Sequence, residues 1–452
     1  MDLVALLRRP EGKSLEFKRD ASSSAGLLRT IIAFANTSGG TLLVGVEDGT
    51  GHVRGVEDPV ALEERLANRI SDSILPRILP EIEILPFRST HVMAIRVHPS
   101  SARPHFLANA GLESGTYVRV GSTNRRADQA LIQEMKRFSR GETFDERPMP
   151  DLDSEAVDFR VASELFAPIR KLRRRDLETL RLLTTHQGRT VPSVAGVLLA
   201  GPDRLAHFPD AWIQVGRFDG MDRARIADRM ELKEGLVEAI EGAIAFVEKH
   251  STRGAEIGRV RRIERWSLPP AALREAVINA VVHADYARQG APIRLALFDD
   301  RLEVESPGLL PFGLTVADLP RGVSKLRNRA IGRVFHELGL VEQWGSGVQR
   351  MIAVCRDAGL APPHFEEIGF RFRVTLRLER VAEPVLDATD RSILKVLDAP
   401  EGRATREVAE AIELTPRATR TRLASLVDRG LVREIGTGPK DPKRRYHLTE
   451  SL

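Results

Sequence analysis

A segment near the middle of the chain places three polar side chains at intervals of four residues. In the sequence LREAVINAVVHADY, from Leu273 to Tyr286, these are Glu275, Asn279 and His283. Residues four apart lie on one face of an α-helix, so the pattern predicts a helix that presents a carboxylate, a carboxamide and an imidazole along one line. The other residues are mostly apolar and predict a buried opposite face. A solvated amphipathic helix is the alternative interpretation of this segment alone.

Two glycine-containing turns follow this predicted helix. The first is ESPGLLP, at Glu305 to Pro311, and the second is WGSGVQRM, where Gly345 and Gly347 precede a further helix. Glycines before a helix N-terminus let backbone N–H groups approach a phosphate, and the helix dipole favours its negative charge. One glycine pair is weak evidence by itself, so the order of the three segments is the informative part.

This order resembles the ATP-binding fold of gyrase, histidine kinases and MutL (the GHKL fold), in the divergent form found in bacterial regulators often labelled as helicases. The resemblance implies ATP and Mg²⁺ as cofactors, Glu275 as the residue that orients the attacking water, and Asn279 as a Mg²⁺ ligand. The implied nucleotide-binding residues are Asn279, His283, Asp285, Ser306, Gly308, Arg327, Asn328, Gly345 and Gly347.

One position departs from that fold. Its members read adenine with the aspartate of a D-x-G motif, and Ser306 stands at this place in the sequence SPG. A hydroxyl can hydrogen-bond the exocyclic amine of adenine but brings no charge. We therefore expect nucleotide binding, while hydrolysis stays open, with a weak ATPase as the form that the residues would allow.

The N-terminal segment resembles the Alb-like nucleic-acid-binding domain shared with Schlafen proteins. The similar stretches are SLEFKRD from Ser14, IIAFANTSGGTLLVGVEDGTGHVRGV from Ile31, RPHF from Arg103 and TYVRVGSTNRRAD from Thr116. Basic side chains in these stretches are expected to line a phosphate-binding face. They are Lys18, Arg19, Arg119, Arg125 and Arg126.

The same domain admits a second interpretation, as a metal-dependent ribonuclease. Schlafen nucleases cut RNA with a cluster of carboxylates, and Glu11, Glu16 and Asp48 fall close to those positions. Such oxygens could hold divalent ions that activate water against a phosphodiester. We expect a structural role instead, because alternation in SLEFK places Glu16 and Lys18 on one outer face, where the carboxylate can orient Lys18 and neighbouring arginines.

The C-terminal segment has the pattern of a winged helix-turn-helix, with three short helices and two strands joined by a basic loop. Thr415 precedes Pro416 at the start of the third helix, and Gly430 ends it. Residues expected to contact nucleic acid are Arg417, Arg420 and Arg422 in this helix, and Lys440, Lys443, Arg444 and Arg445 in the wing. A winged helix used for protein contact is the alternative.

These segments imply a multidomain chain of α/β and α+β parts. We expect a Schlafen/Alb-like domain at 1–140, a linker at 141–160, a GHKL-like α/β sandwich at 161–380 and a winged helix at 386–452. In the first domain, AGLLRTIIAFAN predicts a helix, TLLVGVED and HVRGV predict a hairpin across DGTG, and EIEILPF and HVMAIRVHP predict a strand pair.

The composition limits the classes of protein to which the chain can belong. The 452 residues have a net charge of +5, 42% hydrophobic residues and a single cysteine, Cys355, so no internal disulfide is available. No apolar run is long enough to span a membrane and no signal peptide is recognisable, so we expect a cytoplasmic protein without a membrane partner. The sequence also lacks a GxxxxGK[ST] P-loop, so helicase chemistry is not expected.

Taken together, the sequence predicts an ATP-binding, DNA-binding transcriptional regulator whose nucleic-acid binding is gated by nucleotide. RNA is the alternative nucleic acid, and a dimer is the expected oligomeric state. The competing functions are the endoribonuclease and a nucleotide-independent nucleic-acid-binding scaffold.

Overall fold

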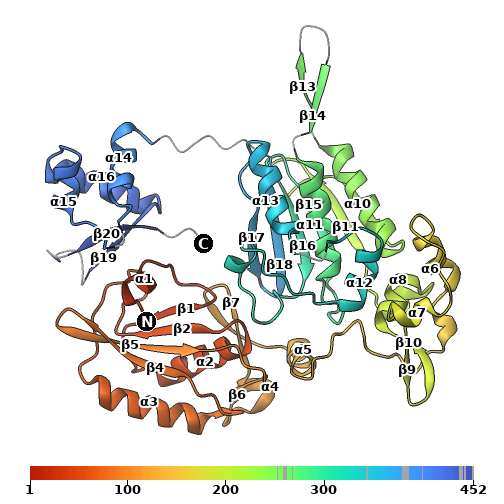
Figure 1. Cartoon of the computed structure of the whole chain (residues 1–452), viewed down its shortest axis with the longest axis horizontal. Helices are drawn as coiled ribbons and strands as arrows, with labels where there is room; N and C mark the ends of the chain where they lie inside the picture. The colour runs from red at the N-terminus through yellow and green to blue at the C-terminus, as the bar shows by residue number, and fades with distance from the viewer. Residues whose placement is uncertain are drawn as a thin grey trace. The chain divides into compact units, whose positions relative to one another are not determined.

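The chain divides into two compact units. A computed structural model describes residues 1–251, 253–257, 262–266, 268–342, 345–378, 386–399, 401–436, 441 and 444–449. One unit combines Met1–Ile132 with Ala382–Leu452, and the other is Gln133–Val381 (Figure 1).

The N-terminal part of the first unit is an α/β domain. Its elements are α1 (Leu3–Leu7), β1 (Leu15–Lys18), α2 (Ser24–Asn36), β2 (Gly40–Val44), α3 (Pro59–Ser73), β3 (Ile74–Leu75), β4 (Glu81–Phe87), β5 (Thr90–Val97), β6 (Phe106–Leu107), α4 (Gly111–Gly115), β7 (Tyr117–Val120), β8 (Thr123–Arg126) and α5 (Gln129–Ser139), whose last residues belong to the second unit. A four-stranded sheet has the order β1-β2-β5-β4, with β1 and β2 parallel and the other pairs antiparallel.

Both faces of this sheet are buried, as the alternation of β2 requires. Leu42 and Val44 pack with α2 and α3, while Leu43 packs with Leu3 and Leu7 of α1. The predicted helix at α2 and the predicted pair β4 and β5 are confirmed.

The predicted hairpin across DGTG forms only in part. Strand β2 itself pairs with β1 and β5, whereas the residues after it make isolated bridges, one between Val46 and Val53 and one between Val56 and His91. The Glu47 N–H also donates to the His52 carbonyl at 2.8 Å, so the two predicted segments pair only beyond the end of β2.

The second unit is built on a mixed six-stranded sheet of order β12-β11-β15-β16-β18-β17. The strands are β11 (Ile213–Phe218), β12 (Ile226–Leu232), β15 (Ile293–Leu297), β16 (Arg301–Pro307), β17 (His364–Ile368) and β18 (Arg371–Arg377). Only the β11–β15 pair is parallel among them. The helices α10 (Leu236–His250), α11 (Pro270–Val282) and α13 (Gly347–Asp357) lie side by side on one face (Figure 1).

Smaller elements complete the second unit. They are η1 (Ser154–Ala156), α6 (Phe159–Phe166), α7 (Asp176–Thr179), β9 (Leu183–His186), β10 (Arg189–Pro192), α8 (Val194–Ala200), α9 (Arg204–His207), the hairpin of β13 (Arg253–Ile257) and β14 (Arg262–Trp266), η2 (Val316–Asp318) and α12 (Arg329–Glu337). The large apolar core joins α8, α10, α11, α12 and the inner face of the sheet.

The polar segment 141–160, predicted to be a linker, is anchored within this unit. The buried Asp145 accepts hydrogen bonds from the backbone N–H groups of Ala330 and Ile331, at 2.7 and 2.9 Å, at the start of α12. Pro148 forms a bridge with Ser193. The side chains that suggest a solvated connector are thus used as helix caps.

The C-terminal part has the predicted winged-helix elements. They are α14 (Ala388–Val396), α15 (Thr405–Ala411), α16 (Pro416–Asp428), β19 (Val432–Ile435) and β20 (Arg445–Leu448). The Thr415 side chain accepts a hydrogen bond from the Ala418 N–H, and Gly430 beyond the helix has a φ of +71°, so both predicted helix ends are confirmed.

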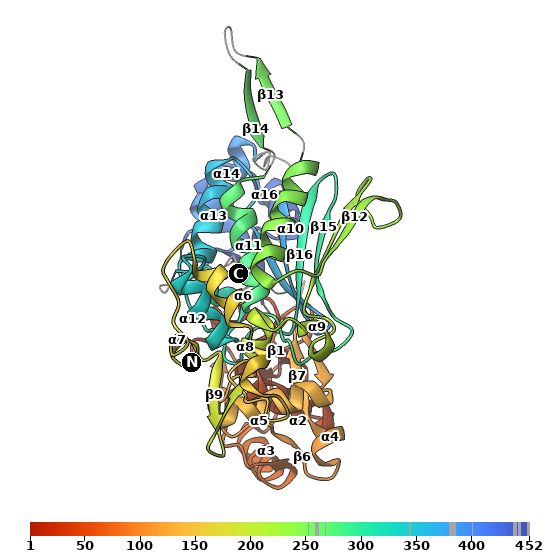
Figure 2. The same cartoon turned by 90° about the vertical axis from the view of Figure 1, so that its right-hand side faces the viewer.

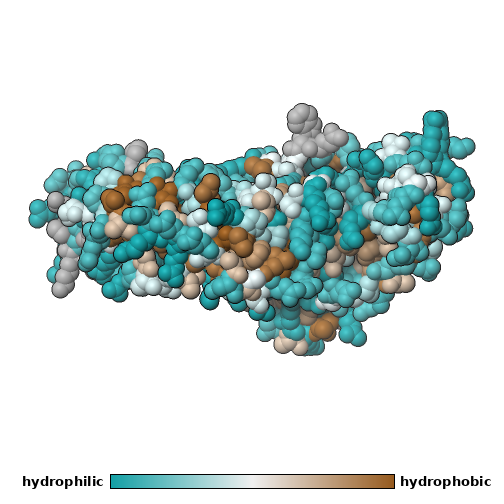
Figure 3. Space-filling view, turned by 90° about the horizontal axis from the view of Figure 1, so that it is seen from below, coloured by the Kyte–Doolittle hydropathy of each residue, from teal (hydrophilic) through white to brown (hydrophobic). Residues whose placement is uncertain are grey.

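The face of the molecule in Figure 3 is mostly hydrophilic, with hydrophobic residues in small groups. Among the described residues, no helix combines the length and the hydrophobicity that crossing a bilayer requires.

Candidate functional site

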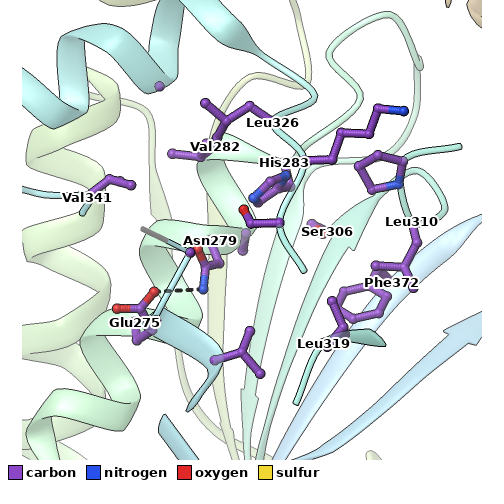
Figure 4. A pocket seen from close by; sticks show the side chains of 18 of the residues that line it. Glu275, Asn279, Val282, His283, Ser306, Leu310, Leu319, Leu326, Val341 and Phe372 are labelled. Atoms are coloured by element: carbon purple, nitrogen blue, oxygen red, sulfur yellow. Dashed lines mark hydrogen bonds between the residues drawn. The ribbon is translucent and has the colours of Figure 1, made fainter. Parts of the chain in front are cut away.

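A cavity of about 440 Å³ opens beside α11 in the second unit (Figure 4). Its walls come from α11, the end of β16, the segment 308–326, α12 and α13. It brings together most of the site residues that the sequence predicts. These are Glu275, Asn279, His283, Ser306, Gly308, Gly345 and Gly347.

The first two residues of the polar stripe bond to each other. The Asn279 Nδ2 donates to Glu275 Oε1 at 3.0 Å, one turn apart on α11 (Figure 4). The rest of the helix is buried, including Ala276, Val277 and Ala280. The helix therefore turns its polar line into the cavity because its other faces form the core, which rules out the solvated amphipathic helix.

Helix α13 approaches Glu275 closely. A Cβ atom on Gly347 would lie 1.8 Å from Glu275 Oε1, so a side chain at this position would displace the carboxylate. Gly345 has a φ of +66°, in the left-handed region that glycine tolerates without strain. Both glycines of the predicted turn are therefore required by the backbone, and Gly347 places the first turn of α13 against the carboxylate.

Sequence reasoning missed Arg350, which also lines the cavity. Its guanidinium lies 3.5 Å from Glu275 and 2.6 Å from Glu342. It is the third residue after Gly347, one turn into α13, and this spacing is the only signal that could have found it. Arg350 compensates the charge of Glu275 and fixes the direction of its carboxylate.

Lys325 is a second cavity residue that the site prediction left out. Its ammonium donates to the Phe312 carbonyl at 2.9 Å and lies 4.2 Å from the centre of the Phe138 ring. The signal was its place in the basic segment KLRNR. A cation therefore stands in the wall formed by the segment 308–326.

His283 caps α11 and lines the same cavity. Burial, with a smaller contribution from the charge of Arg327, lowers its pKa to about 4, so the imidazole is neutral at neutral pH. Its Nδ1 is buried without a hydrogen-bond partner among the described residues. A buried polar atom of this kind calls for a partner from outside the protein.

Strand β16 supplies the floor of the cavity through its alternation. Val304 and Ser306 line the cavity, whereas Glu303 and Glu305 pair with arginines, including Arg223 and Arg373. Ser306 is 5% exposed. The cavity is also lined by apolar side chains, namely Leu309, Leu310, Leu314, Leu319, Val341 and Phe372. A flat apolar group would be sheltered here, with one hydroxyl beside it.

Three predicted nucleotide-binding residues do not line the cavity and are corrected to structural roles. Asn328 is buried, and its Nδ2 donates to the carbonyls of Val282 and Ala284 at 2.9 and 2.8 Å. Arg327 pairs with Glu134 and donates to the Leu309 carbonyl. These contacts hold the chain around the end of α11, although the Asn328 Oδ1 and the Arg327 Nε are buried without a hydrogen-bond partner among the described residues.

Asp285 is the third correction. It is buried, accepts a hydrogen bond from the Ala287 N–H and pairs with Arg288 at 3.2 Å. Tyr286, beside it, donates its hydroxyl to the Val281 carbonyl at 2.9 Å. The ending H-x-D-Y of this segment thus fastens the C-terminus of α11, and only His283 faces the cavity.

The cavity fits a nucleotide in size and in chemistry. Its volume falls within the range of small-molecule sites, and it joins an apolar floor to polar groups at one side. Because the Asn279 amide nitrogen bonds Glu275, the carboxamide oxygen is the atom left for a hard cation. No group of three or more His, Cys, Asp or Glu side chains is arranged to hold a metal within the described part of the chain.

The N-terminal carboxylates do come together, but in two different pairings. Burial raises the pKa of Glu11 to about 7, helped by a hydrogen bond with Asp48, whose pKa this contact lowers. Glu16 lies 2.6 Å from Lys18 and also pairs with Arg119. Glu16 thus contacts the cations that it was expected to orient, but it is 6% exposed, so its predicted place on an outer face is wrong.

Arg119 is a correction to the predicted phosphate-binding face. Its side chain is fully buried between Glu16, the Gly12 carbonyl and the ring of Phe34, so no surface is left for a phosphate. Lys18 is half-buried and bonded to Glu16. Arg19, Arg125 and Arg126 are exposed and remain candidates.

In the winged helix, Arg417 and Arg420 are exposed at the start of α16, whereas Arg422 pairs with Asp387 and Asp390 at 2.6 and 3.3 Å. Arg444 pairs with Glu434, and Arg445 with Glu407. Lys440 and Lys443 lie outside the described residues.

Three protein-family models match separate parts of the chain. The model described as "Schlafen, AlbA_2" matches residues 11–128, "Putative ATP-dependent DNA helicase recG C-terminal" matches 290–376, and "Winged helix-turn-helix DNA-binding" matches 386–433. The second match covers Ser306 and the glycine turn before α13. It begins after α11, so the roles of Glu275 and Asn279 have no support from it.

Two solved structures are similar to the chain. The DIP2311 protein from Corynebacterium diphtheriae is 24% identical over 91% of this chain and 87% of its own, with a TM-score of 0.43. The N-terminal domain of a putative ATP-dependent DNA helicase RecG-related protein from Nitrosomonas europaea is 26% identical over 27% of this chain and 91% of its own, with a TM-score of 0.22. No curated protein matches the sequence.

The order of the three family matches agrees with the sheets and helices described above. The word helicase occurs in the description of the second family model and in the name of the second similar structure. The sequence of this chain contains no P-loop. The chain is therefore a multidomain protein that combines an N-terminal Schlafen/AlbA-like domain, a GHKL-like ATPase domain and a C-terminal winged helix-turn-helix DNA-binding domain.

Proposed function

We propose that the protein is a transcriptional regulator whose DNA binding is gated by ATP bound in the cavity beside α11. The observation that carries this proposal is the convergence of Glu275, Asn279, His283 and Ser306 on one cavity, in a chain that also has a winged helix. In this proposal α11 and the cavity beside it sense the nucleotide, and the winged helix binds the DNA.

Each side chain has a role that follows from its contacts. The Asn279 carboxamide oxygen would hold the metal ion, and the neutral His283 would offer its Nδ1, which has no partner among the described residues, to the ligand. Ser306 would hydrogen-bond the base at the apolar floor. When bound, Mg²⁺ supplies charge neutralisation of the phosphates.

Hydrolysis is a separate question, and we propose that it is slow. Glu275 would orient a water molecule, but its carboxylate is shared between the Asn279 amide and the Arg350 guanidinium. A carboxylate already held by two protein groups is less free to orient a water molecule. Slow hydrolysis suits a gate, since the ATP-bound state then lasts long enough to affect DNA binding.

Gating requires that ATP favour one state of the protein. A ligand shifts an equilibrium between two arrangements only by the difference of its affinities for them. DNA affinity should therefore change with Mg·ATP, and by linkage DNA should change the affinity for ATP by the same factor.

The test measures both affinities on the full chain. Calorimetry should detect Mg·ATP binding to the wild type and a loss of about tenfold or more in Asn279→Ala, whereas Glu275→Gln should bind and lose any hydrolysis. Fluorescence anisotropy with duplex DNA should show an ATP-dependent affinity in the wild type and in Glu275→Gln, but not in Asn279→Ala. The absence of Mg·ATP binding would contradict the sensor, and equal DNA affinity with and without ATP would contradict the gate.

Two further functions are left as alternatives. A nucleotide-independent scaffold predicts no ATP-induced shift in melting temperature. A ribonuclease predicts divalent-dependent cleavage of structured RNA that is lost in Glu16→Gln, and the pairing of Glu16 with Lys18 and Arg119 speaks against it. RNA as the true partner and a cytoplasmic location stay predictions.

A further inference from the structure

Strand β12 forms an open edge of the six-stranded sheet. It is the first strand in the order β12-β11-β15-β16-β18-β17, and among the described residues it pairs only with β11 (Figure 2). Its residues Ile226 and Met230 are 52% and 45% exposed. An exposed edge strand offers a row of backbone N–H and C=O groups to another strand.

The side chains of this edge alternate between two faces of the sheet. Met230 lies opposite the buried Val215 of β11, so it belongs to the helix-covered face. Arg229 and Glu231 lie opposite Gly216 and Gln214 and belong to the other face. The two charges are exposed, of opposite sign, and lie one on each side of Met230. Glu231 also contacts the exposed Lys233 of its own chain at 2.7 Å, a contact that pairing with Arg229 of a second copy would share or replace.

Symmetry limits how two copies of this strand can pair. In an antiparallel ladder, hydrogen-bonded and non-hydrogen-bonded residue pairs alternate along the strands. A two-fold axis must therefore pass through a pair in which one residue faces its own copy, since an axis between residues would make two neighbouring pairs of the same kind. Only registers centred on a single residue are allowed.

The charges and the length of the strand together select one of these registers. An axis at Asp228, Arg229 or Glu231 would set two identical charges against each other, and an axis at Ile226 or Ala227 would set Arg229 against Arg223 or Arg225. An axis at Leu232 would oppose Glu231 and Lys233, but it would place the ladder beyond the last residue of the strand. An axis at Met230 sets Met230 against Met230, and it sets each Arg229 against the Glu231 of the other copy. Opposite charges across a ladder stabilise the pair and like charges destabilise it.

We propose that β12 pairs antiparallel with the β12 of a second copy about a two-fold axis at Met230, so that the six-stranded sheets of two chains become continuous. The occupant is a second copy because the complementarity lies within the strand itself. Asp228 does not disturb this pairing, since Lys249 and His250 already contact its carboxylate, at 3.2 and 2.8 Å. The pairing does not depend on nucleotide.

Cysteine cross-linking tests the register. Facing residues of a ladder have Cα atoms about 4.5 to 5.5 Å apart, within the range that a disulfide spans. Met230→Cys should therefore form a cross-linked dimer under mild oxidation. Ile226→Cys is the matched control, because it is similarly exposed but lies four residues from the axis, about 27 Å from its own mate at about 3.4 Å per residue. The native Cys355 is buried and should add no background.

Charge reversal tests the partner. Light scattering should find a dimer in the wild type, at least about tenfold weaker dimerisation in Arg229→Glu and in Glu231→Arg, and recovery in the double reversal Arg229→Glu/Glu231→Arg. A wild type that stays monomeric, a dimer that ignores both reversals, or equal cross-linking of Ile226→Cys and Met230→Cys would each overturn the proposal. A monomer would leave this edge to a strand from another protein.

Discussion

Ser306 is the position where a single substitution should change which nucleotide the cavity prefers. Its hydroxyl can either donate or accept a hydrogen bond, so it can face the amine at C6 of adenine or the carbonyl at C6 of guanine. We therefore expect the wild type to bind ATP and GTP with similar affinity. Ser306→Asp replaces the hydroxyl with a group that, when ionised, only accepts.

The size of the change follows from the burial of the site. Ser306 is 5% exposed, so water screens the new contact little. A hydrogen bond to a charged group stabilises by about 1.5 to 3 kcal/mol, compared with about 1 kcal/mol for a neutral pair, so ATP should bind about fivefold more tightly. With GTP, the carboxylate would face the C6 carbonyl of guanine, which cannot donate a hydrogen bond to it. This unpaired contact should weaken the binding of GTP by about 1 to 3 kcal/mol. The preference for ATP over GTP should rise at least about tenfold.

Calorimetry with Mg·ATP and Mg·GTP on the wild type, Ser306→Asp and Ser306→Ala is the assay. Ser306→Ala is the control, because it removes the hydroxyl without adding charge and should weaken both nucleotides by a few-fold. Burial raises the pKa of a carboxyl group, so the gain in Ser306→Asp should shrink as the pH is lowered. If both variants keep their fold and bind ATP with an unchanged preference over GTP, Ser306 does not contact the base and the assignment of the floor is wrong.

Two further predictions concern the other ends of the chain. In the winged helix, Arg420→Ala should weaken specific DNA binding by about 1 to 3 kcal/mol and relax sequence preference, whereas Arg422→Ala should have a smaller effect because Asp387 and Asp390 already hold that guanidinium; anisotropy at several salt concentrations distinguishes them, and a larger loss in Arg422→Ala would contradict the assignment. In the N-terminal domain, the folded state keeps a proton on Glu11 up to about pH 7, while the unfolded chain releases it near pH 4.5. The stability that this proton contributes is present below pH 4.5 and is lost as pH rises through 7. The melting temperature of Glu11→Gln should therefore be higher than that of the wild type at pH 8 and little different at pH 5. A difference in melting temperature that does not change with pH would contradict the raised pKa of Glu11.

The sequence was sufficient for features that depend on local pattern. Apolar residues in helical spacing predict α2 and α11, because a helix repeats its faces every few residues whatever surrounds it. The winged helix is predicted for the same reason, since Thr415, Pro416 and Gly430 mark the two ends of α16 with their own backbone preferences. The four-residue spacing of Glu275, Asn279 and His283 also predicts that they share a face, and they share one cavity.

Features that depend on residues far apart in the chain were decided by tertiary structure. An arginine has the same local signal whether it is exposed or buried, so the sequence could not separate Arg119, which Glu16 draws into the interior, from the exposed Arg125. Asn328 is polar and close to the motif, but the carbonyls of Val282 and Ala284 at the end of α11 take its amide. Arg350 reaches Glu275 only because Gly347 allows α13 to approach α11. Periodicity fixes which side of an element a residue occupies, and only the packing of other elements against that side determines whether the side chain meets solvent, a partner or a ligand.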